Sequence, residues 1–323
     1  MNLGTPRTFA GYALVRRLAV SATAELFEAR SLDLPVADAP RLTLKRLLPH
    51  AQEEPSCVAR FVEEKALLAR LDHPRVGALV TAGVHNGSDY VVLSYLEGQD
   101  LRVFVGPTRW DDPRFIAAIG AQLCDALHYV HGLRGVSGPL NVVHRDVSPH
   151  NVIVGRTGRL TLIDFGIAKH HLSRVRTATG TIQAKLGYAS PEQVRGESLD
   201  HRSDIFSLGA VLWEIASGQR LFGGLGLTPV EILERCEAAE LPVFPPAGHY
   251  GGDPSPLLWD IVRGMLSRAP TDRPTDCAVL SDVFAEVLRH DDPETIVSDR
   301  FAHLSREAAP AKPRSLPEGV PTP

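Results

Sequence analysis

The segment His144-Arg145-Asp146-Val147-Ser148-Pro149-His150-Asn151 and the apolar strands after it decide how this chain folds. One predicted strand, Val152-Ile153-Val154, follows directly, and a second, Leu160-Thr161-Leu162-Ile163, ends in Asp164-Phe165-Gly166. Carboxylate and amide groups beside apolar strands are costly to bury unless they are used. Asp146, Asn151 and Asp164 carry the oxygen donors that Mg²⁺ prefers beside phosphate oxygens. The pattern therefore predicts a magnesium and phosphate site at the ends of neighbouring strands.

Further motifs follow in a fixed order along the chain. They are Ser190-Pro191-Glu192, Asp204-Ile205-Phe206-Ser207-Leu208-Gly209 and Asp272-Arg273-Pro274. Taken alone, an Asp beside Gly or Pro is a turn former, and Asp204 is a candidate helix N-cap. Turn chemistry does not produce six motifs in order, and here the sequence resembles the protein kinase family over about residues 9–290. It is most similar to bacterial serine/threonine kinases, particularly the myxobacterial type with His-Arg-Asp-Val-Ser-Pro-x-Asn in the catalytic loop.

The hydrophobic pattern divides the chain into a strand-rich first part and a helical second part. Alternating runs at 12–18, 24–30, 41–47, 77–85 and 89–93 predict five strands, and helical spacing predicts one helix over 55–71. Longer helical patterns cover 115–133, 203–217, 257–267 and 275–288. The resemblance implies an α+β, bilobal kinase fold with an N-lobe over about 9–96 and a larger, mainly helical C-lobe over about 97–290. Residues 291–323, rich in Pro, Ala and charge, predict a disordered tail.

The resemblance implies a reaction and assigns its groups one position at a time. Asp146 would accept or orient the proton of the substrate hydroxyl, and Asn151 and Asp164 would hold the metal. ATP and Mg²⁺ are the cofactors implied, and a protein is the substrate implied.

Lys45 ends the predicted strand Leu42-Thr43-Leu44-Lys45. By resemblance it would reach the α- and β-phosphates and pair with Glu64 of the first helix, for which the neighbouring Glu63 is the poorer choice. On its own, Lys45 is compatible with a solvated strand end, because lysines are mostly exposed.

The residues that the resemblance implies for the nucleotide pocket come from both lobes. They are Leu18, Leu26, Thr43, Lys45, Ser94, Leu96, Asp100 and Ile153. Leu26 and Ile153 would sandwich the adenine ring, the backbone of Ser94-Tyr95-Leu96 would bond its edge, and Leu93 would lie behind the pocket. Asp100 would contact the ribose. Away from the pocket, Glu192 would form a structural ion pair with Arg273.

The turn between the first two predicted strands departs from the family pattern. The family has Gly-x-Gly-x-x-Gly there, whereas Ala19, Ser21 and Ala24 occupy the three glycine positions. Glycine permits positive φ and lets backbone amides approach phosphates closely. Thr43 also replaces a smaller Ala against adenine. Both changes predict a higher dissociation constant for nucleotide, and neither removes a catalytic group.

Ser148 and Lys185 form a second departure, in which two residue types are exchanged. Ser148 stands where the family has Lys, and Lys185 stands where it has Thr. We expect Lys185 to supply a cation to the γ-phosphate and Asp146, and Ser148 to supply the hydroxyl. The alternative is a surface lysine in a mobile loop.

The segment between Asp164 and Glu192 carries hydroxyl groups beside arginines. Its candidates are Ser173, Thr177, Thr179 and Thr181, with Arg174 and Arg176 nearby. Arg145 precedes the catalytic Asp and is a cation for a phosphate placed in this segment. Autophosphorylation on one or more of the three threonines is therefore expected.

Composition excludes several classes of protein. The net charge of -4, with scattered Lys and Arg, argues against nucleic acid or an anionic membrane as the main partner. The start of the chain does not resemble a signal peptide, and no apolar run is long enough to span a bilayer. The four cysteines lack a Cys-x-x-Cys pair, which favours reduced thiols in the cytoplasm. His128 and His131 lack a third ligand, which disfavours a metal site.

Three functions fit these residues, and the leading one is an active serine/threonine kinase. The first rival is a pseudokinase that binds nucleotide or acts as a scaffold, which the glycine-free turn favours. The second is a phosphotransferase for small molecules, against which the predicted Glu192–Arg273 pair and the long segment before it argue. Burying charged groups without use is costly, so the complete ionic set favours the enzyme. Oligomeric state, substrate protein and activating signal are not indicated by the sequence.

Overall fold

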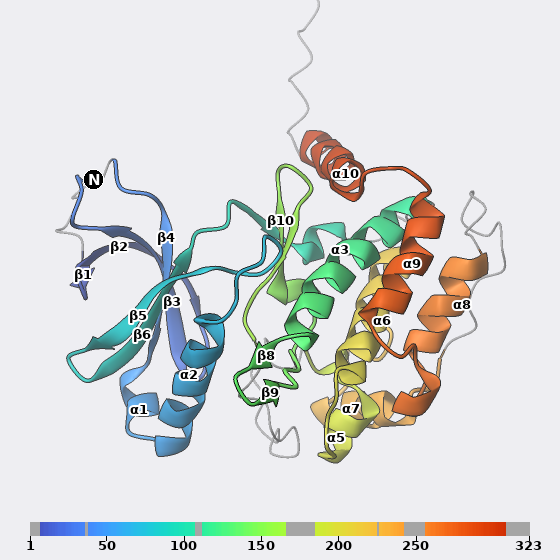
Figure 1. Cartoon of the computed structure of the whole chain (residues 1–323), viewed down its shortest axis with the longest axis horizontal. Helices are drawn as coiled ribbons and strands as arrows, with labels where there is room; N and C mark the ends of the chain where they lie inside the picture. The colour runs from blue at the N-terminus through green and yellow to red at the C-terminus, as the bar shows by residue number, and fades with distance from the viewer. Residues whose placement is uncertain are drawn as a thin grey trace, which may run out of the picture.

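A six-stranded antiparallel sheet forms the body of the N-terminal lobe, and helices form most of the C-terminal lobe (Figure 1). The computed structural model describes residues 7–35, 38–106, 112–165, 185–224, 226–241 and 256–307. The sheet has the order β1-β2-β3-β4-β6-β5. Its strands are β1 (Arg7–Phe9), β2 (Tyr12–Val20), β3 (Ala24–Ser31), β4 (Leu42–Leu47), β5 (Leu79–His85) and β6 (Ser88–Ser94). The predicted α+β, two-lobed fold is confirmed.

The N-terminal lobe has one strand and one helix more than the sequence predicts. β1 pairs with β2 through Ala10-Gly11, whose φ angles of 50° and 83° are those of a favoured two-residue hairpin turn. Three residues are too few to show alternation, so the pattern did not indicate β1. The helices are α1 (Pro49–Gln52) and α2 (Pro55–Leu68), each with a proline at its start, and α2 is the predicted one.

The C-terminal lobe is built around a buried helix. Its helices are α3 (Pro113–His131), α5 (Pro191–Arg195), α6 (Arg202–Ser217), α7 (Pro229–Ala238), α8 (Pro256–Met265) and α9 (Cys277–Leu288), with 3₁₀ turns η1 (Leu101–Phe104), η2 (Pro149–Asn151) and η4 (Pro270–Asp272). Every residue of α6 from 203 to 216 is buried, as its apolar pattern predicted. α3 packs against α6 and α9. No helix among the described residues is both long and apolar enough to cross a membrane.

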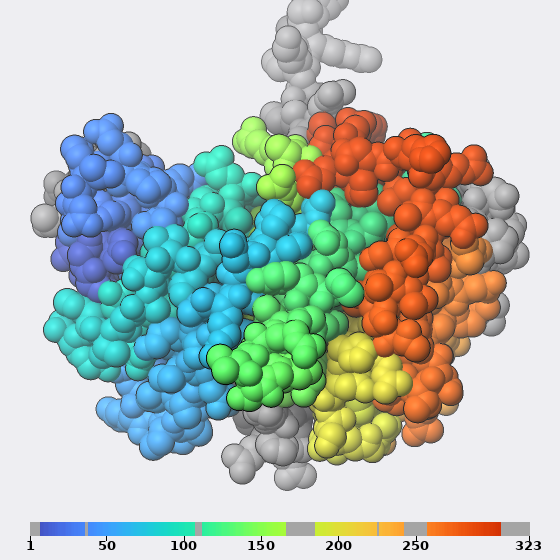
Figure 2. Space-filling model, viewed as in Figure 1, coloured from blue at the N-terminus to red at the C-terminus, as the bar shows by residue number. Residues whose placement is uncertain are grey.

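A small sheet positions the polar ends of the apolar strands. Its order is β11-β10-β7, with β7 (Gly98–Asp100), β10 (Val152–Gly155) and β11 (Leu160–Leu162). Val152 pairs with Leu162, so Asn151, just before β10, and Asp164, just after β11, lie at the same end of this hairpin. A second hairpin, β8 (Arg134–Gly135) and β9 (Gly138–Pro139), follows α3. Figure 2 shows the N-terminal lobe, in blue and cyan, packed along the green segment that contains α3 and this hairpin.

The chain after residue 291 does not begin as a disordered tail. Residues Pro293–Glu307 form α10, which packs against α3 and lies beside the β10–β11 hairpin (Figure 1). Val297 is fully buried, and Oε1 of Glu294 lies 3.0 Å from Arg75 and 3.3 Å from Arg159. Composition misled the prediction, because a few apolar residues at helical spacing are enough when a core surface is available. Residues 308–323 of the predicted tail lie outside the described residues.

Candidate active site

Lys45 links elements of both lobes. On β4 it lies opposite Leu26 of β3, and its Nζ is 2.6 Å from Oε1 of Glu64 on α2. The same Nζ is 2.8 Å from Oδ1 of Asp164, just after β11. The predicted partner Glu64 is therefore in contact with Lys45, whereas Glu63 is exposed. This arrangement holds α2 and the end of β11 at fixed positions around one cation.

Lys45 keeps its charge although its side chain is only 12% exposed. Burial alone would lower the pKa of Lys45, but the carboxylates of Asp164 and Glu64 outweigh burial and raise the pKa above its ordinary value. A buried charge is tolerated where it is paired and hydrogen-bonded. The ammonium group is thus a fixed cation that can bind an anionic ligand between the lobes.

The backbone of the loop 144–151 is held by Asp204 of α6. Asp204 is fully buried, and its carboxylate accepts hydrogen bonds from the amides of His144 (2.7 Å) and Arg145 (2.8 Å). Arg145 has a φ of 66°, which L residues rarely adopt and which these bonds stabilise. Asp204 lies in the first turn of α6, whose N-cap is His201, so the N-cap role considered for Asp204 is wrong. Burial lowers the pKa of His144 more than the nearby carboxylates of Asp204 and Asp146 raise it, so the imidazole is neutral at pH 7.

Asp146, Asn151 and Lys185 form a second cluster of polar groups. Nδ2 of Asn151 donates to the backbone oxygen of Asp146 (2.8 Å) and to its Oδ2 (2.7 Å). Nζ of Lys185 lies 3.0 Å from Oδ2 of Asp146 and 2.7 Å from Oδ1 of Asn151. Lys185 is therefore not the surface lysine that the sequence left open, since its side chain is 16% exposed and in contact with both.

In the second half of the loop 144–151, two buried side-chain atoms have no hydrogen-bond partner in the described part of the chain: Oγ of Ser148, a fully buried residue, and Nδ1 of His150. Burial, Arg102 and Lys185 lower the pKa of His150 to about 4. Ser148 and neutral His150 thus offer hydrogen-bonding atoms that a bound molecule would satisfy.

The side chains implied for adenine share one property. Leu18, Leu26, Thr43, Leu93, Leu96 and Ile153 are all half-buried. Along their strands, Leu26, Thr43 and Ile153 each lie between two buried residues. In a strand, neighbours point to opposite faces, so these side chains point away from the core. Thr43 also pairs with Leu93 across β4 and β6. Ser94, at the end of β6, donates its amide to the backbone oxygen of Ala78.

Asp100 is engaged within its own turn. It caps η1 and accepts three bonds from Arg102: from the amide (3.2 Å), from Nε (2.7 Å) and from a terminal nitrogen (2.6 Å). Burial would raise the pKa of Asp100, but Arg102 outweighs it and the pKa is lowered. Asp100 also pairs with Ile153 across β7 and β10, so it lies beside the half-buried face.

The glycine-free turn between β2 and β3 is closed by a side chain. Oγ of Ser21 donates to the oxygen of Ala24 (3.0 Å) and accepts from the Ala24 amide (3.0 Å) and the Thr23 amide (3.4 Å). No residue of this turn has positive φ. Glycine is therefore not required for the turn to form. A serine at the start of a turn is a recognisable signal for such closure, and sequence reasoning missed it.

Known proteins match most of the chain. The family described as "Protein kinase domain" matches residues 38–291. The chain belongs to the protein kinase family. This kinase is 34% identical over 305 residues to "Tyrosine-protein kinase MasK" of Myxococcus xanthus, covering 92% of this chain and 44% of that protein. It is 33% identical over 242 residues to "Serine/threonine-protein kinase PknB" of Mycolicibacterium smegmatis, covering 72% of this chain and 36% of that protein. The kinase thus spans less than half the length of these curated relatives.

Solved structures agree with the fold of this kinase. The crystal structure of the Mycobacterium tuberculosis PknI kinase domain superposes with a TM-score of 0.61 at 25% identity, covering 88% of this chain and 99% of that one. A mutant form of the same domain has a TM-score of 0.60 and covers 89% of this chain. The family match ends at 291, so α10 lies outside it.

The donors of this kinase fit the magnesium that the family uses. Oδ1 of Asn151 and the carboxylate of Asp164 are hard oxygens at one end of the β10–β11 hairpin. The φ of Asp164 is 63°, a conformation that turns the chain directly after β11. No group of three or more His, Cys, Asp and Glu with metal-binding geometry exists among the described residues, including around His128 and His131. A magnesium ion there would therefore need phosphate or water oxygens as well.

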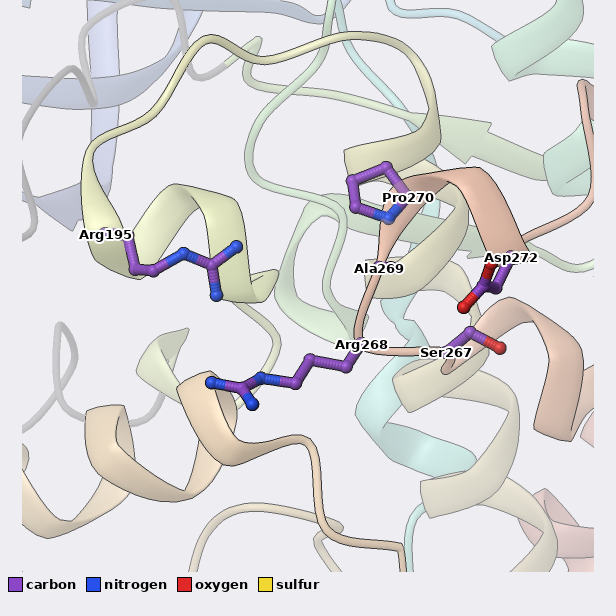
Figure 3. Close-up of a pocket in the computed structure, with 6 residues that line it drawn as sticks. All are labelled: Arg195, Ser267, Arg268, Ala269, Pro270 and Asp272. Atoms are coloured by element: carbon purple, nitrogen blue, oxygen red, sulfur yellow. The ribbon is translucent and has the colours of Figure 1, made fainter.

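The predicted pair of Glu192 and Arg273 is present deep in the C-terminal lobe. Two nitrogens of Arg273 lie 2.6 and 2.8 Å from the carboxylate oxygens of Glu192, and both residues are buried. A nearby cavity has a volume of about 540 Å³, and Figure 3 shows the side chains that line it. It is lined by Arg195, Ser267, Arg268, Ala269, Pro270 and Asp272, so it contains none of the candidate catalytic residues. The candidate threonines of 177–181 lie outside the described residues.

Proposed function

We propose that this protein kinase transfers the γ-phosphoryl group of ATP to serine or threonine hydroxyls of a protein. The observation that carries the proposal is the pair of ionic clusters, one around Lys45 and one around Asp146. Each buries or half-buries a cation between oxygen atoms: Lys45 with Glu64 and Asp164, and Lys185 with Asp146 and Asn151. Fixed charges of this kind stabilise phosphoryl transfer, which depends on positioning and electrostatics.

Asp146 is proposed to accept a hydrogen bond from the attacking hydroxyl. Its carboxylate is oriented by Asn151 Nδ2 at 2.7 Å, so it has one defined direction. Lys45 is proposed to bind the α- and β-phosphates, and Asn151 and Asp164 to hold Mg²⁺. When bound, Mg²⁺ would neutralise negative charge on the phosphate oxygens. The half-buried side chains of Leu26, Ile153 and their neighbours are proposed to contact adenine.

The Lys185 and Ser148 exchange is part of this proposal. Nζ of Lys185 is 3.0 Å from Asp146, within reach of a phosphoryl group that approaches the same carboxylate. Oγ of Ser148 is buried without a partner in the described part of the chain, and an unsatisfied hydroxyl of this kind costs about 1–3 kcal/mol. A substrate hydroxyl or phosphate oxygen would remove that cost, which supports a function for Ser148.

The two rival functions have less support. A pseudokinase needs none of the ionic groups, yet all of them are present and paired. The turn without glycine forms through Ser21, so its composition no longer argues for a lost activity. A phosphotransferase for small molecules has no need for the buried Glu192–Arg273 pair, which holds α5 in place.

Turnover of ATP with magnesium tests the proposal, with Asp146→Asn as the inactive control. Phosphorylated products should contain phosphoserine or phosphothreonine, as the names of relatives such as PknB suggest, and autophosphorylation should map to Thr177, Thr179 or Thr181. Phosphotyrosine as the main product would favour the activity in the name of MasK instead. Nucleotide binding without turnover in both proteins would favour the pseudokinase.

A further inference from the structure

The segment that follows α2 lies alongside the end of β11. Both backbone groups of Leu162 bond to this segment: its amide donates to the oxygen of Arg75 (2.8 Å), and its oxygen accepts from the amide of Gly77 (2.9 Å). Leu162 lies two residues before Asp164, whose carboxylate contacts Lys45. The backbone of the segment therefore fixes the strand end that carries this carboxylate.

The side chain of Arg75 is held by oxygen atoms from two helices. Nε lies 3.0 Å from Oδ2 of Asp125, and one terminal nitrogen donates to Oε1 of Gln122, both on α3. The other terminal nitrogen lies 3.0 Å from Oε1 of Glu294 on α10. Gln122 also accepts a hydrogen bond from the amide of Leu160 in β11 (2.9 Å). The Arg75 side chain is only 17% exposed, so its charge depends on these partners.

α10 is seated on the β10–β11 hairpin by contacts of its own (Figure 1). Gly158, in the turn between these strands, has a φ of 82°, and a Cβ there would overlap the backbone oxygen of Glu294. Val297 is fully buried, and the ring of Phe301 packs edge-on against Phe104, with centroids 6.4 Å apart. The packing of the whole helix therefore holds the carboxylate of Glu294 at this place, in addition to its ion pairs.

The same segment also fixes the end of α2. The amide of Asp72 donates to the hydroxyl of Tyr129 on α3 (2.7 Å), and the ring of His73 stacks on the ring of Tyr129, with centroids 4.7 Å apart. Glu64 of α2 and the carboxylate after β11 both contact Nζ of Lys45. A displacement of the segment would therefore move two of the groups around that cation.

We propose that Arg75 is a positioning residue for phosphoryl transfer and that Glu294 of α10 completes its setting. Arg75 joins α3, α10 and β11, and through Leu162 it fixes where the carboxylate of Asp164 lies. The inference rests on the proposed function, in which Asp164 holds Mg²⁺. α10 follows the region that matches the family, so a helix outside that region supports the metal-binding end of the hairpin.

Binding of ADP with and without Mg²⁺ tests the proposal apart from turnover. Calorimetry on the native full chain gives the factor by which Mg²⁺ tightens ADP binding. In Arg75→Ala we expect this factor to be about tenfold smaller, while the affinity for adenosine, which has no phosphate, stays within about twofold of the native value. An equal factor in the two proteins would overturn the proposal.

The same titrations separate this inference from the proposed function. ADP binding that Mg²⁺ does not tighten in the native chain would overturn the metal role of Asp164 and the positioning role of Arg75 with it. Normal magnesium-dependent binding in a native chain without turnover would overturn only the proposed function.

Hydrogen exchange in the ligand-free chain distinguishes positioning from a general loss of stability. In Arg75→Ala the peptide 158–165, which contains β11, should exchange about tenfold faster, whereas the peptide 203–216 of α6 should be unchanged. Equal acceleration of both peptides would mean that Arg75 acts on stability alone, and it would overturn the proposal.

Three further variants test the part that α10 plays. Glu294→Ala removes one of the three partners of Arg75 and should reduce the magnesium factor about threefold, so it also serves if Arg75→Ala does not fold. Arg75→Lys keeps a cation for the same oxygens and should recover part of the loss. Asp299 is an exposed acid on the same helix, so Asp299→Ala is the matched control and should behave as the native chain. No effect of Glu294→Ala, or an equal loss in Asp299→Ala, would refute the role of Glu294.

Discussion

Replacing Lys185 by Thr should reduce kcat by about 100- to 1,000-fold with a small change in KM for ATP. Nζ of Lys185 is 3.0 Å from Oδ2 of Asp146 and 2.7 Å from Oδ1 of Asn151, in a setting where its side chain is 16% exposed. Removing one fixed donor that stabilises transition-state charge costs about 2.7–4 kcal/mol, or about 100- to 1,000-fold in rate. Negative charge spreads over the phosphoryl group during transfer, so removal of the Lys185 cation should lower kcat and leave KM nearly unchanged.

The exchange between Lys185 and Ser148 supplies a matched control. Ser148→Lys alone places a second cation beside Lys185 and should also be impaired. The double variant Ser148→Lys/Lys185→Thr restores the arrangement that the family uses, and we expect its kcat to return to within about tenfold of the native value. Steady-state phosphorylation of a protein substrate at saturating ATP measures all four proteins. An unimpaired Lys185→Thr, or a double variant no better than the worse single one, would refute the reasoning.

Other predictions concern the turn, the buried ion pair and the loop histidine. Ser21→Ala removes the hydroxyl that closes the β2–β3 turn. A titration of ATP should then show a KM about three- to tenfold higher with little change in kcat, and an unchanged KM would contradict the prediction. Arg273→Ala leaves Glu192 buried without its cation, so urea denaturation should show a free energy of unfolding lower by about 3–5 kcal/mol. Arg263 is exposed, so Arg263→Ala is the near-neutral control. His150 has a pKa lowered to about 4, so its contribution to stability is present above its unfolded pKa of about 6.5 and is lost as pH falls through about 4. His150 is partly exposed, which reduces the expected effect. The loss of unfolding free energy between pH 7 and pH 4 should be about 1–2 kcal/mol smaller in His150→Gln than in the native chain, and identical pH profiles for the two proteins would argue against this.

The sequence by itself determined the fold class and the principal ionic groups. Asn151 and Asp164 could be found because they flank the apolar strands β10 and β11, and strand ends are visible in a local pattern. Asp146 was found because it belongs to the same short motif as Asn151. The Glu64 and Arg273 partners were found through the order of motifs in the family. Alternation and helical spacing also indicated most of the elements that carry these residues.

Only the tertiary structure decided which distant side chains meet. Lys185 was expected to approach Asp146, but only the structure shows that its Nζ also lies 2.7 Å from Oδ1 of Asn151. The packing of α3 against α9, which are far apart in the sequence, depends on Gly120, because a side chain there would collide with the ring of Phe284. α10 likewise forms on a surface that the rest of the chain provides. Periodicity reports the backbone near each residue, whereas contacts between distant residues are set by helix packing and strand pairing, which no local pattern contains.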